Sequence, residues 1–349
     1  MPRTTRPAPA IEQQPVAQPL PAPSAAAIEA TRHPHVSPAG VAAVVLTLLA
    51  WTTIPLFLRY FIHDIDGWTA NGWRYGISAL IWAPVLLHAS AKGTMPKGLW
   101  RASLTPSLWN AAAQICFGLS PYFLPPALMI FSMRLQIVFV AVAAAVMFPS
   151  ERRVLRSPPF LAALAVTVIG TTLTLLLTPG GLGHGTIKGV ALAIVSGFLY
   201  AMYALGVRKN MVGMNPVKAF AAVSIWTSAV LVLGMLAFGD SHGAHVLNLS
   251  PYKLTMLLLS AVIGIGLGHT FYFFSIARLG LVVTAGVVQL QPIAVAFAST
   301  ILLHSVFHEE LTAWQWVTGL SAVAGAVGML VAQHRLASRL RRPSAARAE

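Results

Sequence analysis

Residues 279–330 read LGLVVTAGVVQLQPIAVAFASTILLHSVFHEELTAWQWVTGLSAVAGAVGML, and this stretch decides the fold class. Two apolar runs, each long enough to cross roughly 30 Å of hydrocarbon, flank a short polar hinge. The first run carries Gln289, Gln291 and Pro292 in its interior, and the second carries glycines that let helices approach closely. Because polar side chains and a helix-breaking proline are costly in lipid, we expect them to face protein or water. The stretch predicts a membrane hairpin with a polar break in one arm.

The composition of the whole chain excludes an ordinary soluble domain. Of 349 residues, 56% are hydrophobic and only 9% are charged, which is typical of a protein with several membrane spans. The net charge of +14 comes from basic residues in short clusters between apolar runs, so it indicates membrane topology and not a nucleic-acid partner. The single cysteine, Cys116, lies in an apolar run and rules out cysteine-based metal sites.

Ten apolar segments predict an all-α polytopic membrane protein with ten transmembrane helices. We place them at roughly 39–60, 67–88, 104–122, 125–148, 158–178, 186–207, 216–238, 253–275, 281–303 and 311–333. Nearly all lysines and arginines outside these segments fall on one side of the membrane, and only Arg59, Lys188 and Lys253 fall on the other. Since positive loops stay in the cytoplasm, we expect both termini to be cytoplasmic and the protein to lie in the cell (inner) membrane.

Short matches between the two halves of the chain indicate an internal repeat. Residues 118–123 (GLSPYF) match 268–273 (GHTFYF), and residues 134–137 (RLQI) match 289–292 (QLQP), in the same order. A repeat with an odd number of spans places the two halves in opposite orientations across the membrane. Two inverted five-helix repeats are a transporter architecture, with the substrate site where the halves meet.

The repeat divides the chain into four parts. We expect a disordered cytoplasmic tail at 1–38, a first five-helix repeat at 39–178, a second at 186–333 and a basic cytoplasmic tail at 334–349. The first tail is rich in proline and alanine without any hydrophobic period. The last can contact anionic lipid headgroups through its arginines.

Three motifs in the second half resemble a known family. They are GLGHTFYFFSIARLG from Gly266, VVQLQPIAVA from Val287 and EELTAWQWVTG from Glu309. They resemble the EamA branch of the drug/metabolite transporter (DMT) superfamily, over roughly residues 40–333. The resemblance implies a central cavity lined mainly by spans 1, 3, 4, 6, 8 and 9, alternating access, and export or uptake of small organic metabolites. The first half departs from the pattern, because Ile137 stands where a proline is expected.

Arg134 is the sharpest candidate for substrate binding. It follows the start of its helix by about nine residues, which places it about 13 Å deep in the membrane. A cation there costs at least about 2.5–3.5 kcal/mol, so it should face water, an anion or carbonyl oxygens. Two interpretations remain open: Arg134 binds a carboxylate or phosphate of the substrate, or it ties helices together through backbone carbonyls freed near Pro292.

The repeat makes two pairs of positions equivalent at this place in the chain. Gln136 is equivalent to Gln291, and Arg134 is equivalent to Gln289. Because residues two apart on a helix point to nearly opposite sides, we expect one pair to face the cavity. We favour Arg134 with Gln289 there, and place Gln136 and Gln291 between helices. Pro292 should kink its helix and free a carbonyl that can hold substrate or serve a hinge.

Aromatic residues and a histidine complete the predicted substrate-binding set. His269 and Tyr272 lie one turn apart on span 8, and Tyr200 and Tyr203 share this spacing on span 6. Trp51 precedes a proline in the first span by one turn. The tyrosines can form a wall for a cyclic substrate, and His269 can bind substrate or relay protons. Ordinary helix packing is the alternative for each.

Two further groups of polar residues are weaker candidates. Arg74 lies about a turn from interfacial tryptophans, so we expect it to snorkel outward, and substrate binding is the alternative. His304, His308, Glu309 and Glu310 do not have metal-site spacing, so we expect a solvated outer loop in which Glu310 begins the tenth helix.

These observations favour a secondary transporter of a small organic metabolite, with an amino acid or another carboxylate-bearing compound as cargo. Its expected partners are that substrate and the lipid bilayer, with protons and a homodimer left open, and without nucleic acid. No cofactor, metal or catalytic residue is expected, because the predicted spans contain no acidic residue. The alternatives are an intramembrane lipid-modifying enzyme and a non-transporting membrane receptor.

Overall fold

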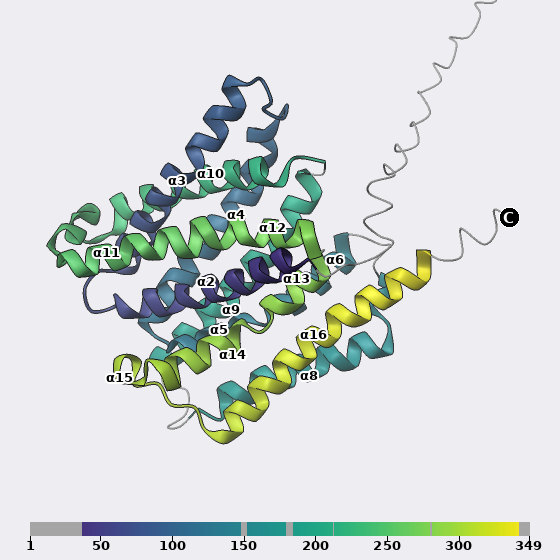
Figure 1. Cartoon of the computed structure of the whole chain (residues 1–349). Helices are drawn as coiled ribbons and strands as arrows, with labels where there is room; N and C mark the ends of the chain where they lie inside the picture. The colour runs from purple at the N-terminus through teal and green to yellow at the C-terminus, as the bar shows by residue number, and fades with distance from the viewer. Residues whose placement is uncertain (1–36, 148–151, 179–183, 212, 280, 342–349) are drawn as a thin grey trace, which may run out of the picture. The chain divides into compact units, whose positions relative to one another are not determined.

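The computed structural model describes residues 37–147, 152–178, 184–211, 213–279 and 281–341, and every regular element in these ranges is helical (Figure 1). The predicted tail at 1–38 falls almost entirely outside the described residues, as do residues 342–349 of the second tail. Residues 334–341 continue the last helix.

The elements in chain order are α2 (Pro38–Tyr60), α3 (Gly67–Ala91), α4 (Leu99–Leu119), η1 (Ser120–Tyr122), α5 (Pro126–Met133), α6 (Gln136–Met147), α7 (Arg152–Leu155), α8 (Pro158–Leu176), α9 (His184–Asn210), α10 (Pro216–Phe238), η3 (Asp240–Asn248), α11 (Pro251–Ser260), η4 (Ala261–Leu267), α12 (Gly268–Leu279), α13 (Leu281–Val288), α14 (Gln291–Phe297), η5 (Ala298–Leu302), α15 (His304–Phe307) and α16 (Ala313–Arg341). Six of the described α-helices begin with a proline in the first turn, a position that has no intrahelical partner for its N–H. They are α2, α5, α8, α10, α11 and α14.

Eight helical segments of the described chain are long and apolar enough to cross a membrane, two fewer than the ten predicted. They are Pro38–Tyr60, Pro126–Ala144, Pro158–Leu176, Thr186–Asn210, Val217–Phe238, Pro251–Ile276, Val283–Leu302 and Ala313–Leu336. The predicted segments 67–88 and 104–122 correspond to α3 and α4, which have 25 and 21 residues. Both are long enough, but polar residues such as Asn71, Arg74 and Asn110 lower their mean hydropathy.

Asp66 shows how the start of α3 is fixed. Its side chain accepts hydrogen bonds from the backbone N–H groups of Trp68 and Thr69, at 2.9 and 3.0 Å, which satisfies two donors at the helix start. Partial burial raises the pKa of the Asp66 carboxyl, but hydrogen bonds from Thr69, Asp240 and Trp68 outweigh it, and the net shift is downward.

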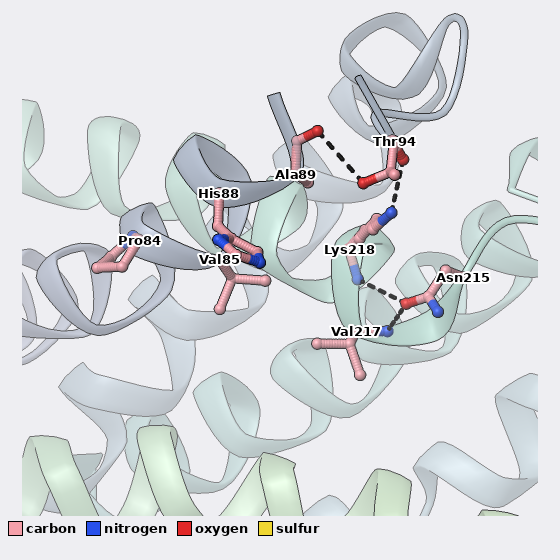
Figure 2. Close-up of a pocket in the computed structure, with 8 residues that line it drawn as sticks. All are labelled: Pro84, Val85, His88, Ala89, Thr94, Asn215, Val217 and Lys218. Atoms are coloured by element: carbon pink, nitrogen blue, oxygen red, sulfur yellow. Dashed lines mark hydrogen bonds between the residues drawn. The ribbon is translucent and has the colours of Figure 1, made fainter. Parts of the chain in front are cut away.

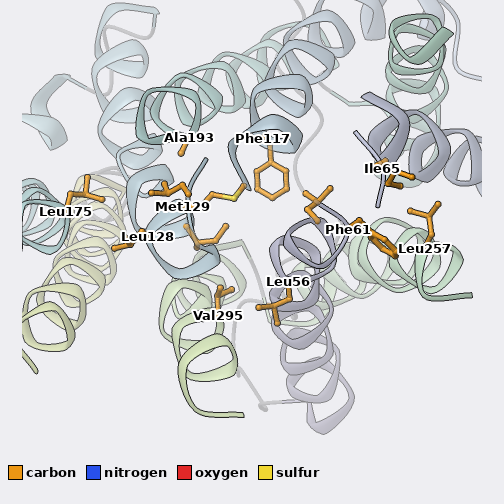
Figure 3. Packing of buried hydrophobic residues seen from close by; sticks show 14 of the residues in the cluster. Leu56, Phe61, Ile65, Phe117, Leu128, Met129, Leu175, Ala193, Leu257 and Val295 are labelled. Atoms are coloured by element: carbon orange, nitrogen blue, oxygen red, sulfur yellow. The ribbon is translucent and has the colours of Figure 1, made fainter. Parts of the chain in front are cut away.

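Two regions of close packing hold the helices together: a hydrophobic core and a helix–helix interface. Figure 3 shows the larger one, where apolar side chains from helices far apart in the sequence meet. Phe61, Phe117 and Met129 come from the first half of the chain, and Leu257 and Val295 come from the second. The two halves therefore share one interior, and the elements that carry the predicted site residues surround it.

The second is the close pairing of α8 with α16, which run side by side in Figure 1. A Cβ at Gly170 would lie 2.7 Å from the backbone nitrogen of Ala322, and one at Gly325 would lie 2.7 Å from that of Thr167. The helices can approach this closely only because both positions are glycine. The expectation that glycines of the last span allow close helix contact is confirmed.

Replacing Gly325 by valine should separate α8 from α16. We expect the free energy of unfolding to fall by about 1–3 kcal/mol, because the added methyl groups meet backbone atoms that cannot move aside. Thermal unfolding of the purified protein in detergent measures the effect. Gly286→Val is the matched control, since a Cβ at Gly286 meets nothing within 4 Å. Equal losses in both variants would contradict the packing explanation.

Each half of the chain also contains a helix broken at the same place in the repeat. The regular α-helical pattern is interrupted between α5 and α6 at residues 134–135, and between α13 and α14 at residues 289–290, where backbone N–H groups bond to the carbonyl three residues before. Pro292 lies in the first turn of α14, where its missing N–H costs little. The first break has no proline, so the sequence difference at Ile137 does not remove the structural equivalence.

Candidate functional site

The side chain of Arg134 connects the break between α5 and α6 to the break between α13 and α14. Its Nη1 donates a hydrogen bond to Gln289 Oε1 at 2.6 Å, and its Nη2 donates to Gln291 Oε1 at 3.0 Å. Arg134 and Gln291 are each only 7% exposed. A buried cation is thus shared between two neutral amide oxygens, and no carboxylate of the described residues forms an ion pair with it. We call Arg134, Gln289 and Gln291 the bridge.

We expected Gln289 and Gln291 to point to nearly opposite sides, but both side chains accept hydrogen bonds from Arg134. The rule that residues two apart point to opposite sides applies inside a continuous helix. Gln289 lies beyond the end of α13, and Gln291 begins α14, so the turn between them brings both amides to one side. The backbone-carbonyl alternative for Arg134 is also not what the structure has, since both terminal nitrogens bind side-chain amides.

Trp51 extends the bridge toward α12. Gln291 Nε2 donates to the backbone oxygen of Trp51 at 2.9 Å. The Trp51 ring lies 5.2 Å from the ring of His269 and 4.9 Å from that of Tyr272. Gly268 makes this approach possible, because a Cβ there would lie 2.7 Å from the indole. The structure therefore brings these residues of α2, α12 and α14 into one contiguous set.

His269 is held firmly within this set. Its ring stacks on Phe220 with centroids 4.3 Å apart, and its Nδ1 lies 2.9 Å from the backbone oxygen of Ile265. Because a carbonyl only accepts, Nδ1 carries the proton in this arrangement, and Nε2 is the nitrogen left for a ligand.

Tyr200 and Tyr203 lie on α9 beside this set. Tyr200 meets Phe117 edge-on at 6.3 Å, and Tyr203 packs against the apolar cluster that contains Phe220. Tyr203 also lies close enough to Tyr272 to interact with it electrostatically. In the described part of the chain, the hydroxyls of these three tyrosines have no hydrogen-bond partner.

Two predicted site residues take other positions. Gln136 starts α6 and packs on α9, where its Cβ would lie 3.3 Å from a Cβ added at Gly197, and it bonds to no other described residue. Pro292 is buried beside Gln291 and offers no polar group of its own.

Arg74 contradicts the expectation that it snorkels outward. Its side chain is 1% exposed, and its Nε donates to Ser260 Oγ at 3.1 Å. The neighbouring Trp73 turns the other way and donates to the backbone oxygen of Gly243 at 2.9 Å. The tryptophans next to Arg74 in the sequence therefore do not set its depth.

Glu309 contradicts the expectation of a solvated loop. It is 5% exposed, and its two carboxylate oxygens accept from the backbone N–H of Ala127, at 3.1 and 3.2 Å, at the start of α5. Burial raises the pKa of Glu309, and hydrogen bonds and the charge of Arg59 oppose this shift without cancelling it.

Glu310 does not begin the last helix. Thr312 and Gln315 start α16 with a reciprocal cap, in which Gln315 N–H donates to Thr312 Oγ1 at 3.2 Å and Thr312 N–H donates to Gln315 Oε1 at 2.9 Å. The order T-x-x-Q was the signal for this start.

Two surface hollows of the protein lie away from the bridge. Figure 2 shows a cavity of 510 Å³ between the end of α3 and the start of α10, where Lys218 Nζ donates to the backbone oxygen of Thr94 at 2.5 Å. A second hollow of 320 Å³ contains the ion pair of Lys253 with Asp64. Both are formed by helix ends and loops, and none of the predicted site residues lines either one. Among the described residues, no group of three His, Cys, Asp or Glu could hold a metal ion.

Comparison with known proteins gives one family match. The model of the EamA-like transporter family matches residues 187–331. No curated protein matches the chain. A solved chain described as "Crystal structure of protein" is 17% identical, with a TM-score of 0.58, and the match covers 85% of this chain and 98% of that one. At this identity the likeness shows the fold alone.

Proposed function

We propose that the chain is a secondary transporter of a small organic metabolite, because residues 187–331 match the model of the EamA-like transporter family, part of the DMT superfamily. The members of this family are typically transporters and not enzymes. We assign an amino acid or another carboxylate-bearing compound as the cargo. Transport by alternating access across the cytoplasmic membrane follows from the architecture proposed next.

We count α3 and α4 as spans two and three, which gives ten spans in two inverted repeats at 39–178 and 186–333. The amide groups of Asn71 and Asn110 donate hydrogen bonds within the protein, so these side chains need not face lipid. Asn71 Nδ2 donates to the backbone oxygen of Gln114 at 2.7 Å, and Asn110 Nδ2 donates to Thr227 Oγ1 at 2.9 Å. An even number of spans leaves both termini on the same side of the membrane. The distribution of lysines and arginines assigns that side to the cytoplasm.

The bridge is the observation that carries the proposal. It links a break in the first repeat to a break in the second through a buried cation whose two partners are neutral. A substrate carboxylate would be a stronger acceptor for the guanidinium than an amide oxygen. A substrate carboxylate that replaces one glutamine as the partner of Arg134 loosens the link between the two repeats. Substrate binding is thereby coupled to the movement of one repeat against the other.

The proposed substrate-binding residues comprise the bridge and the aromatic groups next to it. They are Arg134, Gln289, Gln291, Pro292, Gln136, Trp51, His269, Tyr272, Tyr200 and Tyr203. We place Trp51, His269 and Tyr272 in direct contact with the cargo, since they join the bridge by hydrogen bonding and ring contact.

Counterflow in liposomes tests the proposed function. The purified full chain is reconstituted, the liposomes are loaded with unlabelled amino acids and organic acids in turn, and uptake of the matching labelled compound is followed. We expect transient accumulation of at least one carboxylate-bearing compound, recovered chemically unchanged, and none in protein-free liposomes. A label that is chemically converted would indicate an enzyme, and the absence of counterflow across the panel would refute the carrier.

Cysteine labelling tests the orientation of the second repeat. In a Cys116→Ser background, cysteines replace Lys188 and Lys209, which are exposed at opposite ends of α9. A membrane-impermeant maleimide should label Lys188→Cys only from outside and Lys209→Cys only from the cytoplasmic side. If one side labels both, α9 does not cross the membrane and the inverted arrangement is wrong.

A further inference from the structure

Arg74 differs from Arg134 in what its guanidinium meets. Among the described residues, only Ser260 bonds to Arg74, through Nε, and no carboxylate forms an ion pair with it. Its two terminal nitrogens are left without a hydrogen-bond partner, although the side chain is 1% exposed. Arg134 instead has both terminal nitrogens occupied by glutamine oxygens. The cation that lacks acceptors is therefore Arg74.

Two tyrosines lie within electrostatic range of Arg74. Tyr75 and Tyr200 lie close enough to interact electrostatically with its guanidinium. Tyr200 interacts in the same way with Tyr203, and Tyr203 with Tyr272. In the described part of the protein, none of these four hydroxyls is engaged in a hydrogen bond. A run of unused phenolic donors thus leads from Arg74 toward the rings beside Trp51.

The helix that faces Arg74 is irregular at this point. Ser260 ends α11, and the chain continues as the π-helical segment η4 before α12 begins. Gly264 of η4 lies near the guanidinium, and a Cβ there would lie 3.7 Å from Arg74 Nη2 and 2.6 Å from Ile54 Cγ1. Single π-helical turns inside α-helices are frequent at functional sites.

We propose that Arg74 binds the carboxylate of an aromatic or apolar organic acid, with the hydroxyl of Tyr200 as a second donor, at a position separate from the bridge. The proposal rests on the carrier function above and adds a second position, besides the bridge, for the anionic group of its cargo. Two parallel terminal nitrogens match the two oxygens of a carboxylate. At Arg74 nothing has to be displaced, whereas at Arg134 a carboxylate must replace a glutamine. The tyrosine rings supply the surface for the rest of the compound.

A pair of probes that differ only in charge tests the site. Binding of sodium phenylacetate and of neutral phenylacetamide to the full-length protein in detergent is measured by calorimetric titration at pH 7, with sodium phosphate as a third probe. We expect the wild-type protein to bind phenylacetate at least tenfold more tightly than phenylacetamide or phosphate. Equal affinity for the acid and the amide overturns the proposal, and so does a preference for phosphate.

Variants then locate the binding of the carboxylate. Arg74→Gln should abolish the preference for phenylacetate over phenylacetamide, and Arg74→Lys should keep part of it. Tyr200→Phe removes one hydroxyl and should weaken phenylacetate binding at least threefold, a readout that remains if Arg74→Gln does not fold. Tyr252→Phe, at a tyrosine that is 65% exposed, is the matched control and should change nothing. The proposal is overturned if Arg74→Gln prefers phenylacetate over phenylacetamide as strongly as the wild type does. If Arg74→Gln does not fold, unaltered phenylacetate binding by Tyr200→Phe overturns it.

The outcomes separate this site from the carrier function. If phenylacetate binding depends on Arg74 but no compound shows counterflow, the site proposal stands and the carrier function is refuted. Counterflow with an unaltered acid preference in Arg74→Gln leaves the carrier and refutes the site.

Discussion

Replacing Arg134 by glutamine is expected to reduce counterflow at least about 100-fold. The change removes two charge-assisted hydrogen bonds, each worth about 1.5–3 kcal/mol, and about 3 kcal/mol already corresponds to more than a hundredfold in rate. It also leaves two buried glutamine oxygens facing a neutral amide that can satisfy one of them. Initial rates of counterflow, normalised to reconstituted protein, measure the effect.

Two further variants make this result specific to the bridge. Arg134→Lys keeps the charge but not the fork of donors, so we expect an intermediate rate. Arg101→Gln is the matched control, because it makes the same substitution at an exposed arginine of α4 that lies outside the proposed binding residues. Its rate should stay within about twofold of the wild type. Arg134→Gln at the wild-type rate would show that the bridge has no part in transport.

Replacing Glu309 by alanine is expected to lower the free energy of unfolding by about 1–3 kcal/mol. Because Pro125 and Pro126 have no N–H, Ala127 has the first free donor of α5, and Glu309 is its acceptor. The loss of this acceptor also disconnects the loop before α16 from α5. Thermal unfolding in detergent, followed by circular dichroism, measures the change.

The same carboxyl predicts how stability depends on pH. Since burial raises the pKa of Glu309 in the folded protein, the folded state binds more protons than the unfolded state between the two pKa values. The stabilising effect of the proton is complete below the unfolded pKa and is lost as pH rises through the folded pKa. Glu309→Gln should flatten this part of the profile, whereas Glu310→Gln, at an exposed position, should not. Identical profiles for wild type and Glu309→Gln would refute the assignment.

The contact of Arg134 with Gln289 could be predicted because the repeat aligned the two positions. The contact with Gln291 could not, since it depends on a break in each helix. Proline marks the break before α14, but nothing in the residues Arg134-Leu-Gln-Ile announces the break after α5. Where backbone geometry departs from the helix without a proline or glycine, periodicity assigns side chains to the wrong side.

Arg74 and Glu309 were misplaced for a different reason. Their sequence neighbours, the tryptophans near Arg74 and the acidic and histidine residues near Glu309, are typical of a membrane surface. Their partners lie far along the chain, 186 residues away for Arg74 with Ser260 and 182 for Glu309 with Ala127. Burial that depends on such distant contacts leaves no local pattern to detect.

The polar faces of α3 and α4 have a consequence for biogenesis. Asn110 of α4 donates to Thr227 of α10, which the ribosome adds 117 residues later, and Ser78 of α3 pairs with Ser224 of the same helix. A nascent chain that ends before α10 thus presents unsatisfied amides and hydroxyls to the bilayer. These two helices have to stay beside the insertion machinery until α10 is released, so the first half of this protein matures only together with the second.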